Sequence, residues 1–283
     1  MSGYEKKRTE YSWRRNLTGH LAILVISCDN YHDVWKPFFD LLTKFWPDCP
    51  YPVYLGTNEK DFSYPGVRVV KAGKDSSWAE NVRKHLDQIE EEYVLTFLED
   101  FYIARTVDTS LVENALALTI RDKIDTFSMI LPKKGLPYNG ERNVFHIDPK
   151  MEYCLNTSIA IRKKKVFFDL LKPGYSAWDF EVKNSAEVNR TGTFPGIFVT
   201  SGEDYFHCLN GIWRRKWVPG SVRFCERLGI AVDTSHRPFM SWNDTVWEYF
   251  KRNGRQLLPV SLRKMLKRLL IKIGFSRKFV SQN

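Results

Sequence analysis

The sequence predicts an α/β fold built on a mostly parallel, doubly wound central sheet. Residues 21–27, LAILVIS, form a continuous apolar run, which is typical of a strand buried on both faces. Strand-like and helix-like segments alternate along the first 103 residues, as they do in sheets of this class. The chain of 283 residues is long enough to bury a large core. We expect one domain over residues 19–245, between a polar basic segment at 1–18 and a basic tail at 246–283.

The elements of the first half follow in a regular order. After the first strand, apolar residues from Val34 to Phe45 recur at helical spacing. Two short strands come next, YPVYLGT at 51–57 and GVRVVKAG at 66–73. Residues 76–92 predict a helix capped by Ser76 or Ser77, and residues 93–103, YVLTFLEDFYI, predict the fourth strand.

Three segments of the second half of the chain predict further strands and helices. Residues 154–162, CLNTSIAIR, predict a strand that leads into a helix with apolar residues up to Leu171. Residues 175–188, YSAWDFEVKNSAEV, predict an aromatic-rich turn followed by a helix. Residues 196–217 are strand-like and end in a cluster of basic residues, Arg214, Arg215 and Lys216.

Charge distribution, cysteine spacing and hydropathy disfavour several classes of function. The net charge is +10, but residues 251–283 contain ten basic and no acidic side chains and residues 1–15 carry a net charge of +3, so the body at 16–250 carries −3. This distribution disfavours a nucleic-acid-binding body. The five cysteines form no C-x-x-C pair and indicate a reducing compartment. No signal peptide and no membrane-spanning segment are expected.

Two adjacent acids, Glu99 and Asp100, interrupt the apolar stretch at 93–103. In parallel sheets, ligands bind beyond the carboxyl ends of the strands, which is where these side chains are expected. Carboxylate oxygens suit Mg²⁺ or Mn²⁺, which in turn neutralises a diphosphate. A structural pair at a strand end is the alternative. The chain lacks a G-x-G-x-x-G and a P-loop motif, which disfavours a dinucleotide-dependent dehydrogenase and a P-loop ATPase.

Six motifs in a fixed order resemble the GT-A-type bacterial glycosyltransferases that build cell-surface polysaccharides. They are LVISCDNYHD, SSWAENVRKHL, FLEDFYI, LNTSIAIRKKKVFFDLL, WDFE followed by NSAEV, and GIWRRKW. The resemblance covers roughly residues 20–240 and depends on the order of all six. It implies a Rossmann-like GT-A domain, a nucleotide-diphosphate sugar donor and an acceptor hydroxyl on a glycan or a lipid-linked sugar.

By this resemblance, LED at 98–100 stands where the family carries its D-x-D motif, with Leu98 in place of the first acid. Asp100, helped by Glu99, is expected to hold a divalent cation, Mn²⁺ or Mg²⁺, and the donor diphosphate. Lys216 or Arg215 is expected to stabilise the leaving nucleoside diphosphate. The other predicted donor-binding residues are Ser27, Asp29, Tyr31, Thr57, Trp78, Asn81 and Arg83.

The WDFE box provides the predicted base and part of the acceptor site. An acceptor hydroxyl needs a carboxylate to take its proton, and Glu181 is the expected base, with Asp179 in reserve. A base on the acceptor implies inversion at the anomeric carbon. Trp178 offers an apolar face for a sugar ring, and Asn156 is the second predicted acceptor contact.

Each of these assignments has a structural alternative. Asp179 and Glu181 suit a helix start, Asp29 suits an Asx turn, and Arg83 suits a helix surface. A rival acidic box, SGEDYFH, contains Glu203, Asp204 and His207, which also suit a solvated turn.

The tail predicts a basic amphipathic helix at 259–280. Leu262, Met265, Leu266, Leu269 and Ile273 share one side, and basic residues cover the others. This composition suits an anionic membrane surface, so we expect a cytoplasmic protein peripheral to the inner face of the membrane. Packing on the domain is the structural alternative. At the level of function, the alternatives are a non-catalytic sugar-nucleotide-binding protein and a nucleic-acid binder that uses the tail.

Overall fold

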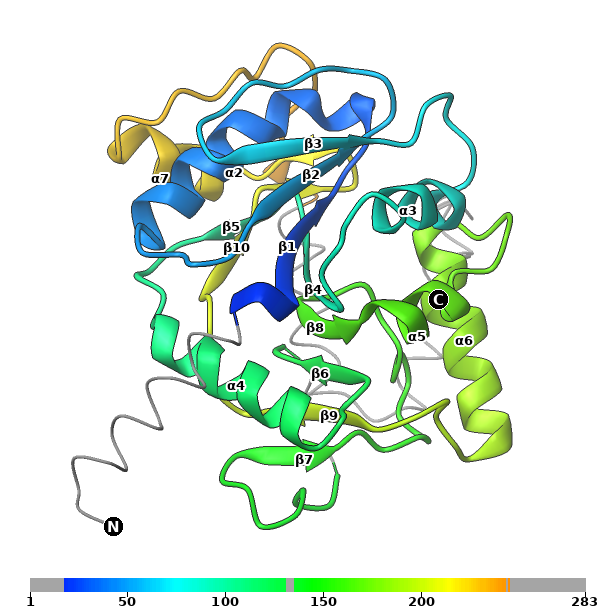
Figure 1. The fold of residues 1–283 in the computed structure, drawn as a ribbon. Coiled ribbons are helices and arrows are strands. Elements are labelled where there is room, and N and C mark those ends of the chain that lie inside the picture. The colour runs from blue at the N-terminus through cyan, green and yellow to red at the C-terminus, as the bar shows by residue number, and fades with distance from the viewer. Residues whose placement is uncertain (1–17, 131–134, 243, 245–283) are drawn as a thin grey trace, which may run out of the picture.

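The structure, a computed structural model, describes residues 18–130, 135–242 and 244. An eight-stranded sheet with the order β3-β2-β1-β4-β8-β6-β9-β7 runs through its centre (Figure 1). Six strands run in one direction: β1 (Leu21–Ile26), β2 (Val53–Thr57), β3 (Val67–Lys71), β4 (Tyr93–Leu98), β6 (Thr126–Ser128) and β9 (Phe198–Ser201). β8 (Ala160–Lys163) and β7 (Val144–His146) run in the opposite direction. The predicted mostly parallel α/β sheet is therefore confirmed.

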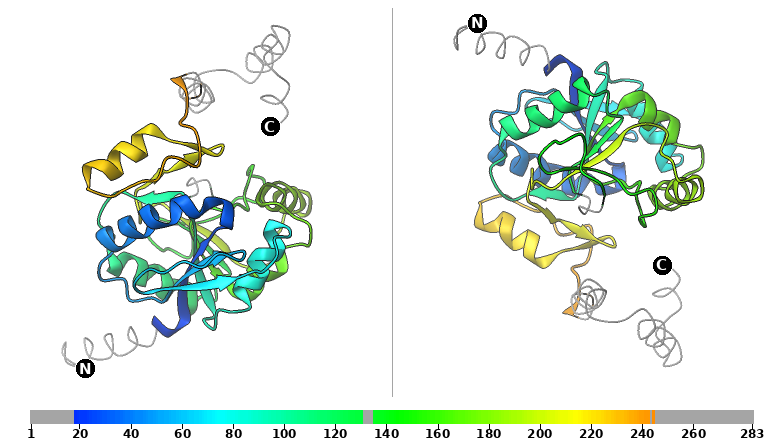
Figure 2. Two further views of the ribbon diagram at one scale, coloured as in Figure 1. Left: turned by 90° about the horizontal axis from the view of Figure 1, so that it is seen from above. Right: turned by 90° about the horizontal axis from the view of Figure 1, so that it is seen from below.

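Helices cover both faces of this sheet (Figures 1 and 2). One face carries α2 (His32–Phe45) and α4 (Thr109–Arg121), and the other carries α3 (Trp78–Leu86), α5 (Lys164–Leu170) and α6 (Ala177–Thr191). A further helix, α7 (Pro219–Arg227), lies on the outer side of α2, where Phe224 stacks on Phe45 with ring centroids 6.1 Å apart.

Two short turns of 3₁₀ helix and two small sheets complete the fold. The 3₁₀ turns are η1 (Thr18–His20) and η2 (Asp29–Tyr31), which flank β1. β5 (Phe101–Ile103) pairs with β10 (Cys208–Asn210), and β11 (Ile212–Trp213) pairs with β12 (Lys216–Trp217). Both small sheets contain chain that follows the carboxyl ends of β4 or β9, so they stand at the edge where a ligand is expected.

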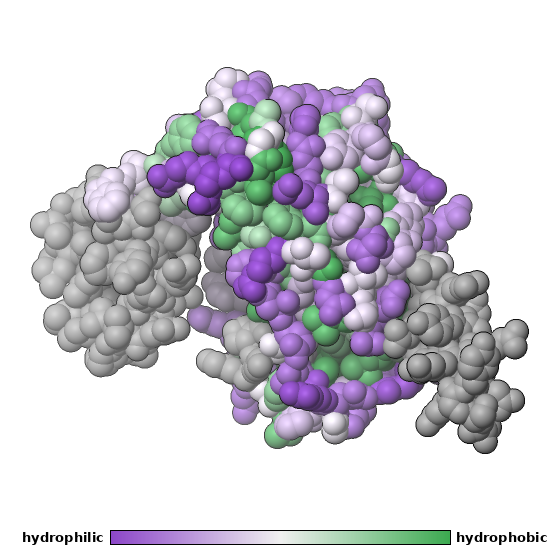
Figure 3. Space-filling model, turned by 90° about the vertical axis from the view of Figure 1, so that its left-hand side faces the viewer, coloured by the Kyte–Doolittle hydropathy of each residue, from purple (hydrophilic) through white to green (hydrophobic). Residues whose placement is uncertain are grey.

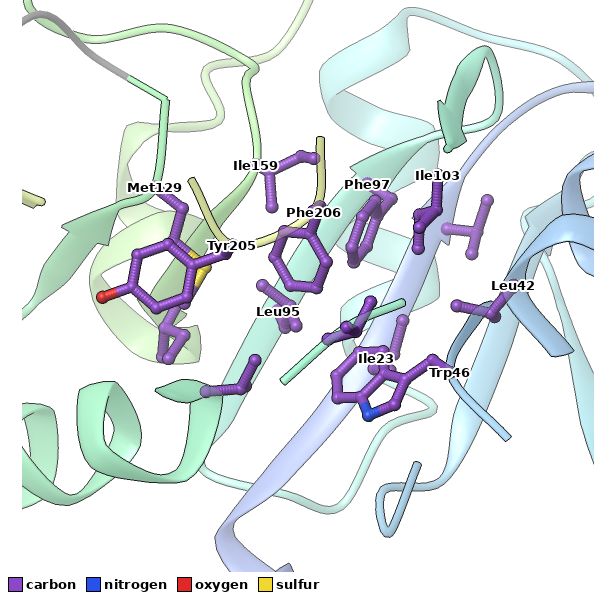
Figure 4. Packing of buried hydrophobic residues seen from close by; sticks show 14 of the residues in the cluster. Ile23, Leu42, Trp46, Leu95, Phe97, Ile103, Met129, Ile159, Tyr205 and Phe206 are labelled. Atoms are coloured by element: carbon purple, nitrogen blue, oxygen red, sulfur yellow. The ribbon is translucent and has the colours of Figure 1, made fainter. Parts of the chain in front are cut away.

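The core is divided by the pleat of β1, which sends alternate side chains to opposite faces. Ile23 and Val25 pack toward α2 and α4, whereas Leu24 and Ile26 pack toward α3, α5 and α6. Figure 4 shows the first of these layers, in which Phe97 of β4 meets Phe206 with ring centroids 4.9 Å apart. Burial on both faces explains why LAILVIS has no polar alternation.

The surface that carries α2, α4 and α7 is a mixture of hydrophilic side chains and separate hydrophobic patches (Figure 3). In the described part of the chain, no helix is long and apolar enough to cross a bilayer. The predicted helix at 259–280 and the segments 1–17 and 246–283 lie outside the described residues.

Three predictions about elements need correction. The predicted fourth strand divides at Glu99–Asp100 into β4 and β5, which belong to different sheets. The predicted strand 154–162 is strand only from Ala160, and it is antiparallel to β4. Asp179 and Glu181 lie within the first two turns of α6 and not in a turn before it. The helix α4 was not predicted at all.

Candidate functional site

A cleft of about 760 Å³ opens at the carboxyl ends of β1 and β4. It is lined after β1 by residues 26–28, 30 and 31, and after β4 by residues 98–100. Ser76 and Trp78 reach it from the start of α3, and Ala177 from the start of α6. Chain segments that are far apart in sequence therefore meet where ligands bind in parallel α/β sheets.

Glu99 and Asp100 form the turn between the central sheet and the small β5–β10 sheet. The Gly211 amide donates a hydrogen bond of 2.7 Å to the Asp100 carbonyl oxygen, which ties the turn to the residue after β10. A Cβ atom at Gly211 would lie 2.8 Å from the Tyr102 ring, so this close approach requires glycine. The turn is thus fixed by its neighbours and presents two carboxylates to the cleft.

The electrostatics of this pair are unusual for side chains of an ordinary turn. Burial, with the adjacent Asp100 charge as a second cause, raises the pKa of Glu99 well above its usual range. Burial also raises the pKa of Asp100 to about 6. Neither carboxylate has an ion-pair partner within 4 Å in the described part of the chain. A bound cation would reverse both shifts, because it favours the ionised form.

Arg237 is the cation whose charge acts on both acids. Its guanidinium, however, is bonded to Asp33 through two contacts of 2.6 and 2.7 Å, and it donates to the Asn30 carbonyl oxygen at 3.0 Å. Both side chains of the Asp33–Arg237 pair are buried. The positive charge of Arg237 therefore neutralises the charge of Asp33 by direct contact. It acts on the charges of Glu99 and Asp100 only at longer range.

The Asp33–Arg237 pair also anchors a segment that we call the strap, residues 231–242. The Trp217 amide donates to the Pro238 carbonyl oxygen, and the Met240 amide donates to the Trp217 carbonyl oxygen, both at 2.9 Å. His236, Arg237 and Pro238 of the strap line the cleft. Nothing in the sequence pattern of this segment pointed to Arg237, because its partner Asp33 lies 204 residues away.

Arg215 contributes a positive charge from the turn between β11 and β12. Arg214 and Arg215 have φ values of 48° and 62°, so both adopt the left-handed conformation of a two-residue hairpin turn. Side chains with a Cβ adopt it at a cost of about 1 kcal/mol each. Arg215 is exposed and has no ion-pair partner in the described residues, which leaves its charge available to an anion.

The described residues contain no group of three or more His, Cys, Asp or Glu side chains that could hold a metal ion. The two carboxylates at Glu99–Asp100 nevertheless fit Mg²⁺ or Mn²⁺, because such ions are commonly held by one or two carboxylates together with substrate phosphates. Glu99 is buried and Asp100 half-buried, neither has an ion-pair partner among the described residues, and carboxylate oxygens are the donors that a hard cation prefers.

Four other predicted donor-binding residues line the cleft: Ser27, Tyr31, Trp78 and Asn81. The Asn81 amide donates to Asp75 at 2.7 Å, and its oxygen accepts from the Ser76 hydroxyl at 2.9 Å. Asp75 lines the cleft too but was not predicted. The available signal was its position directly before the two serines that were considered as caps; Ser77 is the cap, in a reciprocal capping box with Glu80.

The remaining predicted donor residues do not line the cleft. The Asp29 carboxylate accepts from three successive amides, those of residues 58–60, at 3.0 to 3.2 Å. Arg83 donates to the carbonyl oxygens of Phe168 in α5 and of Leu171 directly after it, and lies over the Phe168 ring. Thr57 donates to the Lys60 carbonyl oxygen, and Lys216 pairs with Asp244 at 2.7 Å. The structure gives all four side chains structural partners.

The two acids of the WDFE box differ from each other. Asp179 completes a capping box with Ser176 and pairs with Lys183 at 2.8 Å, and its pKa falls to about 2 because of these contacts. These contacts fit the structural alternative for Asp179, in which the acid serves at the start of a helix. Glu181 lies one half-turn further along α6, where its Oε1 accepts from the Thr157 amide at 2.8 Å and from the Thr157 hydroxyl at 2.7 Å.

Strand register places the Thr157 region near the acids of the cleft. Thr96 of β4 lies opposite Ala160 of β8, and the two strands are antiparallel. Residue 157 is therefore carried past the end of β4, toward the level of Glu99. The buried Arg162 holds the loop 156–158 in place. It donates hydrogen bonds to the carbonyl oxygens of Asn156 at 2.8 Å and Ser158 at 3.0 Å.

The rival acidic box lies at the same edge of the sheet, after β9. Glu203 accepts from Asn143, whereas Asp204 contacts His207 at 2.9 Å and Arg105 at 3.8 Å. Burial raises the pKa of Cys208 to about 12, and the charges of both Asp204 and Asp100 add to this rise. Asp204 does not line the cleft itself; it lines a neighbouring hollow with Glu203, His207 and Cys208.

A second hollow, of about 1040 Å³, lies between α4 and the edge strand β7. Its acids are already partnered: Glu141 binds Arg121 at 2.7 Å, and Glu203 accepts from Asn143. It lacks the uncompensated carboxylates that distinguish the cleft at β1 and β4.

Comparison with known proteins gives only distant similarities. No protein-family model and no curated protein match this sequence. S. aureus TarS residues 1–349, solved with UDP-GlcNAc, is 14% identical with a TM-score of 0.45 over 66% of this chain and 57% of TarS. The bifunctional IspDF of Campylobacter jejuni is 14% identical with a TM-score of 0.38 over 68% of this chain and 52% of IspDF.

A cytidylyltransferase from Leptospira borgpetersenii is 11% identical, with a TM-score of 0.44 over 83% of this chain and 95% of the enzyme. This chain thus spans little more than half of TarS and IspDF.

Proposed function

We propose that this protein transfers a glycosyl group from a nucleoside-diphosphate sugar to a hydroxyl of a glycan or lipid-linked acceptor, in the synthesis of a bacterial surface polysaccharide. The observation that carries the proposal is the pair Glu99–Asp100. The buried Glu99 and the half-buried Asp100 have no ion-pair partner within 4 Å among the described residues and share a cleft of about 760 Å³ with the exposed Arg215. A divalent cation and a diphosphate together satisfy this combination of charges.

In this proposal Asp100, helped by Glu99, holds Mg²⁺ or Mn²⁺ and through it the donor diphosphate. When bound, the cation supplies positive charge to the phosphates. Arg215 stabilises the negative charge that develops on the leaving nucleoside diphosphate. Ser27, Tyr31, Trp78 and Asn81, which line the same cleft, contact the nucleoside or the sugar of the donor.

The acceptor side requires a base. As the acceptor oxygen bonds to the anomeric carbon, the bond from that carbon to the β-phosphate oxygen breaks, and the acceptor proton passes to a carboxylate. We assign this role to Glu181, whose Oε1 is held by Thr157. Attack opposite the leaving group inverts the anomeric configuration. Asp204 is the alternative base, because it lies at the same sheet edge.

A thermal-shift screen tests the donor site. The full chain is heated with UDP, GDP, CMP and their common sugar conjugates, with and without Mn²⁺. We expect one nucleotide family to stabilise the protein by mass action only when Mn²⁺ is present, and this shift to vanish in Asp100→Ala. Asp61→Ala is the matched control, since Asp61 is 91% exposed and pairs with Lys71 on the surface.

The outcomes separate the proposal from its alternatives. Equal nucleotide stabilisation in Asp100→Ala and the parent would contradict the donor-site assignment. Donor binding without turnover would indicate a non-catalytic sugar-nucleotide-binding protein. Salt-dependent binding to DNA or RNA, without any nucleotide effect, would indicate a nucleic-acid binder. Flotation of the full chain with phosphatidylglycerol vesicles tests the proposed membrane contact of residues 259–280.

A further inference from the structure

We infer that Asp75 selects the nucleobase of the donor, and that this nucleobase carries an imide N–H group, as uracil and thymine do. The inference rests on the proposed glycosyl transfer and names the nucleotide class of its donor. Asp75 lies between β3 and α3 and lines the same cleft as Glu99 and Asp100.

The Asp75 carboxylate is held in one orientation by two buried amides. Its Oδ1 accepts from the Asn58 side-chain amide at 3.0 Å and from the Asn81 side-chain amide at 2.7 Å. Asn58 and Asn81 are each 6% exposed. Two donors occupy both acceptor positions of Oδ1. No described residue donates to Oδ2, so this oxygen is left to accept from a ligand in the cleft.

The two amides are themselves fixed by further partners. The Asn58 side-chain oxygen accepts from the Asp29 amide at 3.0 Å, and the Asn58 backbone amide donates to the Asp29 carboxylate at 3.0 Å. The Asn81 side-chain oxygen accepts from the Ser76 hydroxyl at 2.9 Å. These bonds connect the segments that follow β1, β2 and β3, and they determine which end of each amide is the nitrogen. Asp75 is therefore a rigid hydrogen-bond acceptor.

One fixed acceptor discriminates among the nucleobases. Uracil and thymine have a single N–H, at N3, which can donate to Asp75 Oδ2. Cytosine and adenine have a lone pair on the ring nitrogen of this edge, which a carboxylate repels. Guanine presents two adjacent N–H groups that need both oxygens of a carboxylate, and Oδ1 of Asp75 is already occupied. An imide base fits best.

Two neighbours of Asp75 complement the rest of such a base. The Asn81 amide uses one N–H on Asp75, and no described residue accepts its second N–H. Because Asn81 lines the cleft, this group can donate to a carbonyl oxygen beside N3 of the base. Trp78 lines the cleft as well and offers an aromatic face to a planar ring.

The position of Asp75 relative to Glu99 fits a single nucleotide. Burial raises the pKa of Cys28, which lines the cleft, and the charges of Glu99 and Asp75 add to this rise. Both carboxylates therefore lie near the same thiol. A nucleobase at Asp75 and a diphosphate at Glu99–Asp100 can thus belong to one ligand.

Isothermal titration calorimetry of the full chain with Mn²⁺ tests the inference. The probes are UDP, dTDP, CDP, GDP and ADP. We expect UDP or dTDP to bind the parent about tenfold or more tightly than the other three, because only these two donate from N3. The ratio of the UDP and dTDP affinities identifies the base, since the two differ in the thymine methyl group and the ribose 2′-hydroxyl.

Asp75→Asn is expected to reverse the selection. The amides of Asn58 and Asn81 require an oxygen at the Oδ1 position, so the new NH₂ group replaces Oδ2. This group opposes N3–H of uracil but donates to N3 of cytosine. We expect the ratio of the UDP and CDP dissociation constants to change by about 100-fold in favour of CDP. Asp61→Asn is the matched control, because Asp61 is 91% exposed and does not line the cleft.

The Tm of each variant without nucleotide is measured in parallel to verify that it is folded. A parent that binds CDP, GDP or ADP more tightly than both UDP and dTDP would overturn the inference and leave the donor site intact. Unchanged selectivity in Asp75→Asn would overturn it too. A parent that binds no nucleotide would contradict the proposed glycosyl transfer itself, and the inference with it.

Discussion

The acids of the cleft, Glu99 and Asp100, differ from the acids of α6, Asp179 and Glu181, in how their carboxylates are held, and the α6 acids do not line the cleft. Asp179 and Glu181 on α6 are bonded to serine, threonine and lysine groups, and the pKa of Asp179 is lowered to about 2. Glu99 and Asp100 lie between two sheets without such partners, and burial raises the pKa of both. The protein compensates the acids of α6 with its own groups, whereas it leaves the acids for which we propose cation binding without such partners.

This contrast assigns different roles to residues of one type. Glu181 belongs to the compensated acids, because one of its oxygens accepts hydrogen bonds from Thr157 and its charge acts on the buried Arg162, yet it is also the proposed base. Its proposed role as a base and its structural role can therefore be separated only by experiments that measure turnover and stability together.

The largest expected effect is on turnover. Glu181→Gln keeps a hydrogen-bond acceptor for Thr157 but removes the base, so we expect kcat to fall about 100-fold or more with nucleotide binding unchanged. Asp204→Asn is the matched variant at the alternative carboxylate. A larger loss in Asp204→Asn than in Glu181→Gln, measured by release of nucleoside diphosphate, would transfer the role of base to Asp204.

The second effect is on stability. Arg237→Ala leaves the Asp33 carboxylate buried and unpaired, so we expect the free energy of unfolding to fall by about 3 kcal/mol. Urea denaturation measures this loss. The double variant Asp33→Asn with Arg237→Ala is expected to recover part of it, and no recovery would mean that Arg237 acts mainly through the packing of the strap.

The third effect separates strain from function at one position. Arg215→Gly relieves a left-handed conformation that a Cβ disfavours, and we expect a gain of about 1 kcal/mol in stability. Loss of the charge lowers kcat at the same time, by about tenfold. Arg214→Gly relieves a similar φ and is the control, since Arg214 does not line the cleft. Equal loss of kcat in both variants would contradict the proposal that Arg215 stabilises the leaving nucleoside diphosphate.

The smallest effect is a pH dependence. The folded-state pKa of Asp100, about 6, lies above the value of roughly 4 expected for an unfolded chain, so the folded state binds more protons between these values. Stability from this group is present below pH ~4 and is lost as pH rises to about 6. Asp100→Asn should therefore be stabilised relative to the parent above pH 6 and not below pH 4, in thermal melts without divalent cations.

Added Mn²⁺ should reduce this difference at pH 7, because the ionised Asp100 then has a cation partner. A difference between parent and variant that is constant from pH 4 to 7 would show that the Asp100 carboxyl titrates at its ordinary pKa.

The first half of the fold could be predicted because its signals are local. LAILVIS is apolar throughout since β1 is covered on both faces, and Ser77 with Glu80 is a capping box visible in the sequence. The position of Glu99–Asp100 in the cleft followed from the same strand pattern. The division of residues 93–103 into two strands could not be predicted in this way. It depends on the pairing of β5 with β10, which lies about a hundred residues later in the chain.

The parts of the site that were missed depend on long-range contacts. Arg237 becomes part of the cleft only through Asp33, and Asp29 leaves it only because the amides of residues 58–60 take its carboxylate. The direction of β8, opposite to β4, has no signature in CLNTSIAIR itself. Residue type and spacing identified candidate chemistry, and tertiary partners decided which candidates reach the ligand.

The bond between Asp33 and Arg237 also has a consequence for synthesis of the protein. Domains emerge from the ribosome with the N-terminal part first, so β1, α2 and the acids that follow β4 are available long before the strap. Until residue 237 emerges, Asp33, Glu99 and Asp100 share a half-built pocket with no arginine from the strap. The pairing of Asp33 with the strap is therefore a late event, and a chain that stops before residue 237 lacks one wall of the cleft.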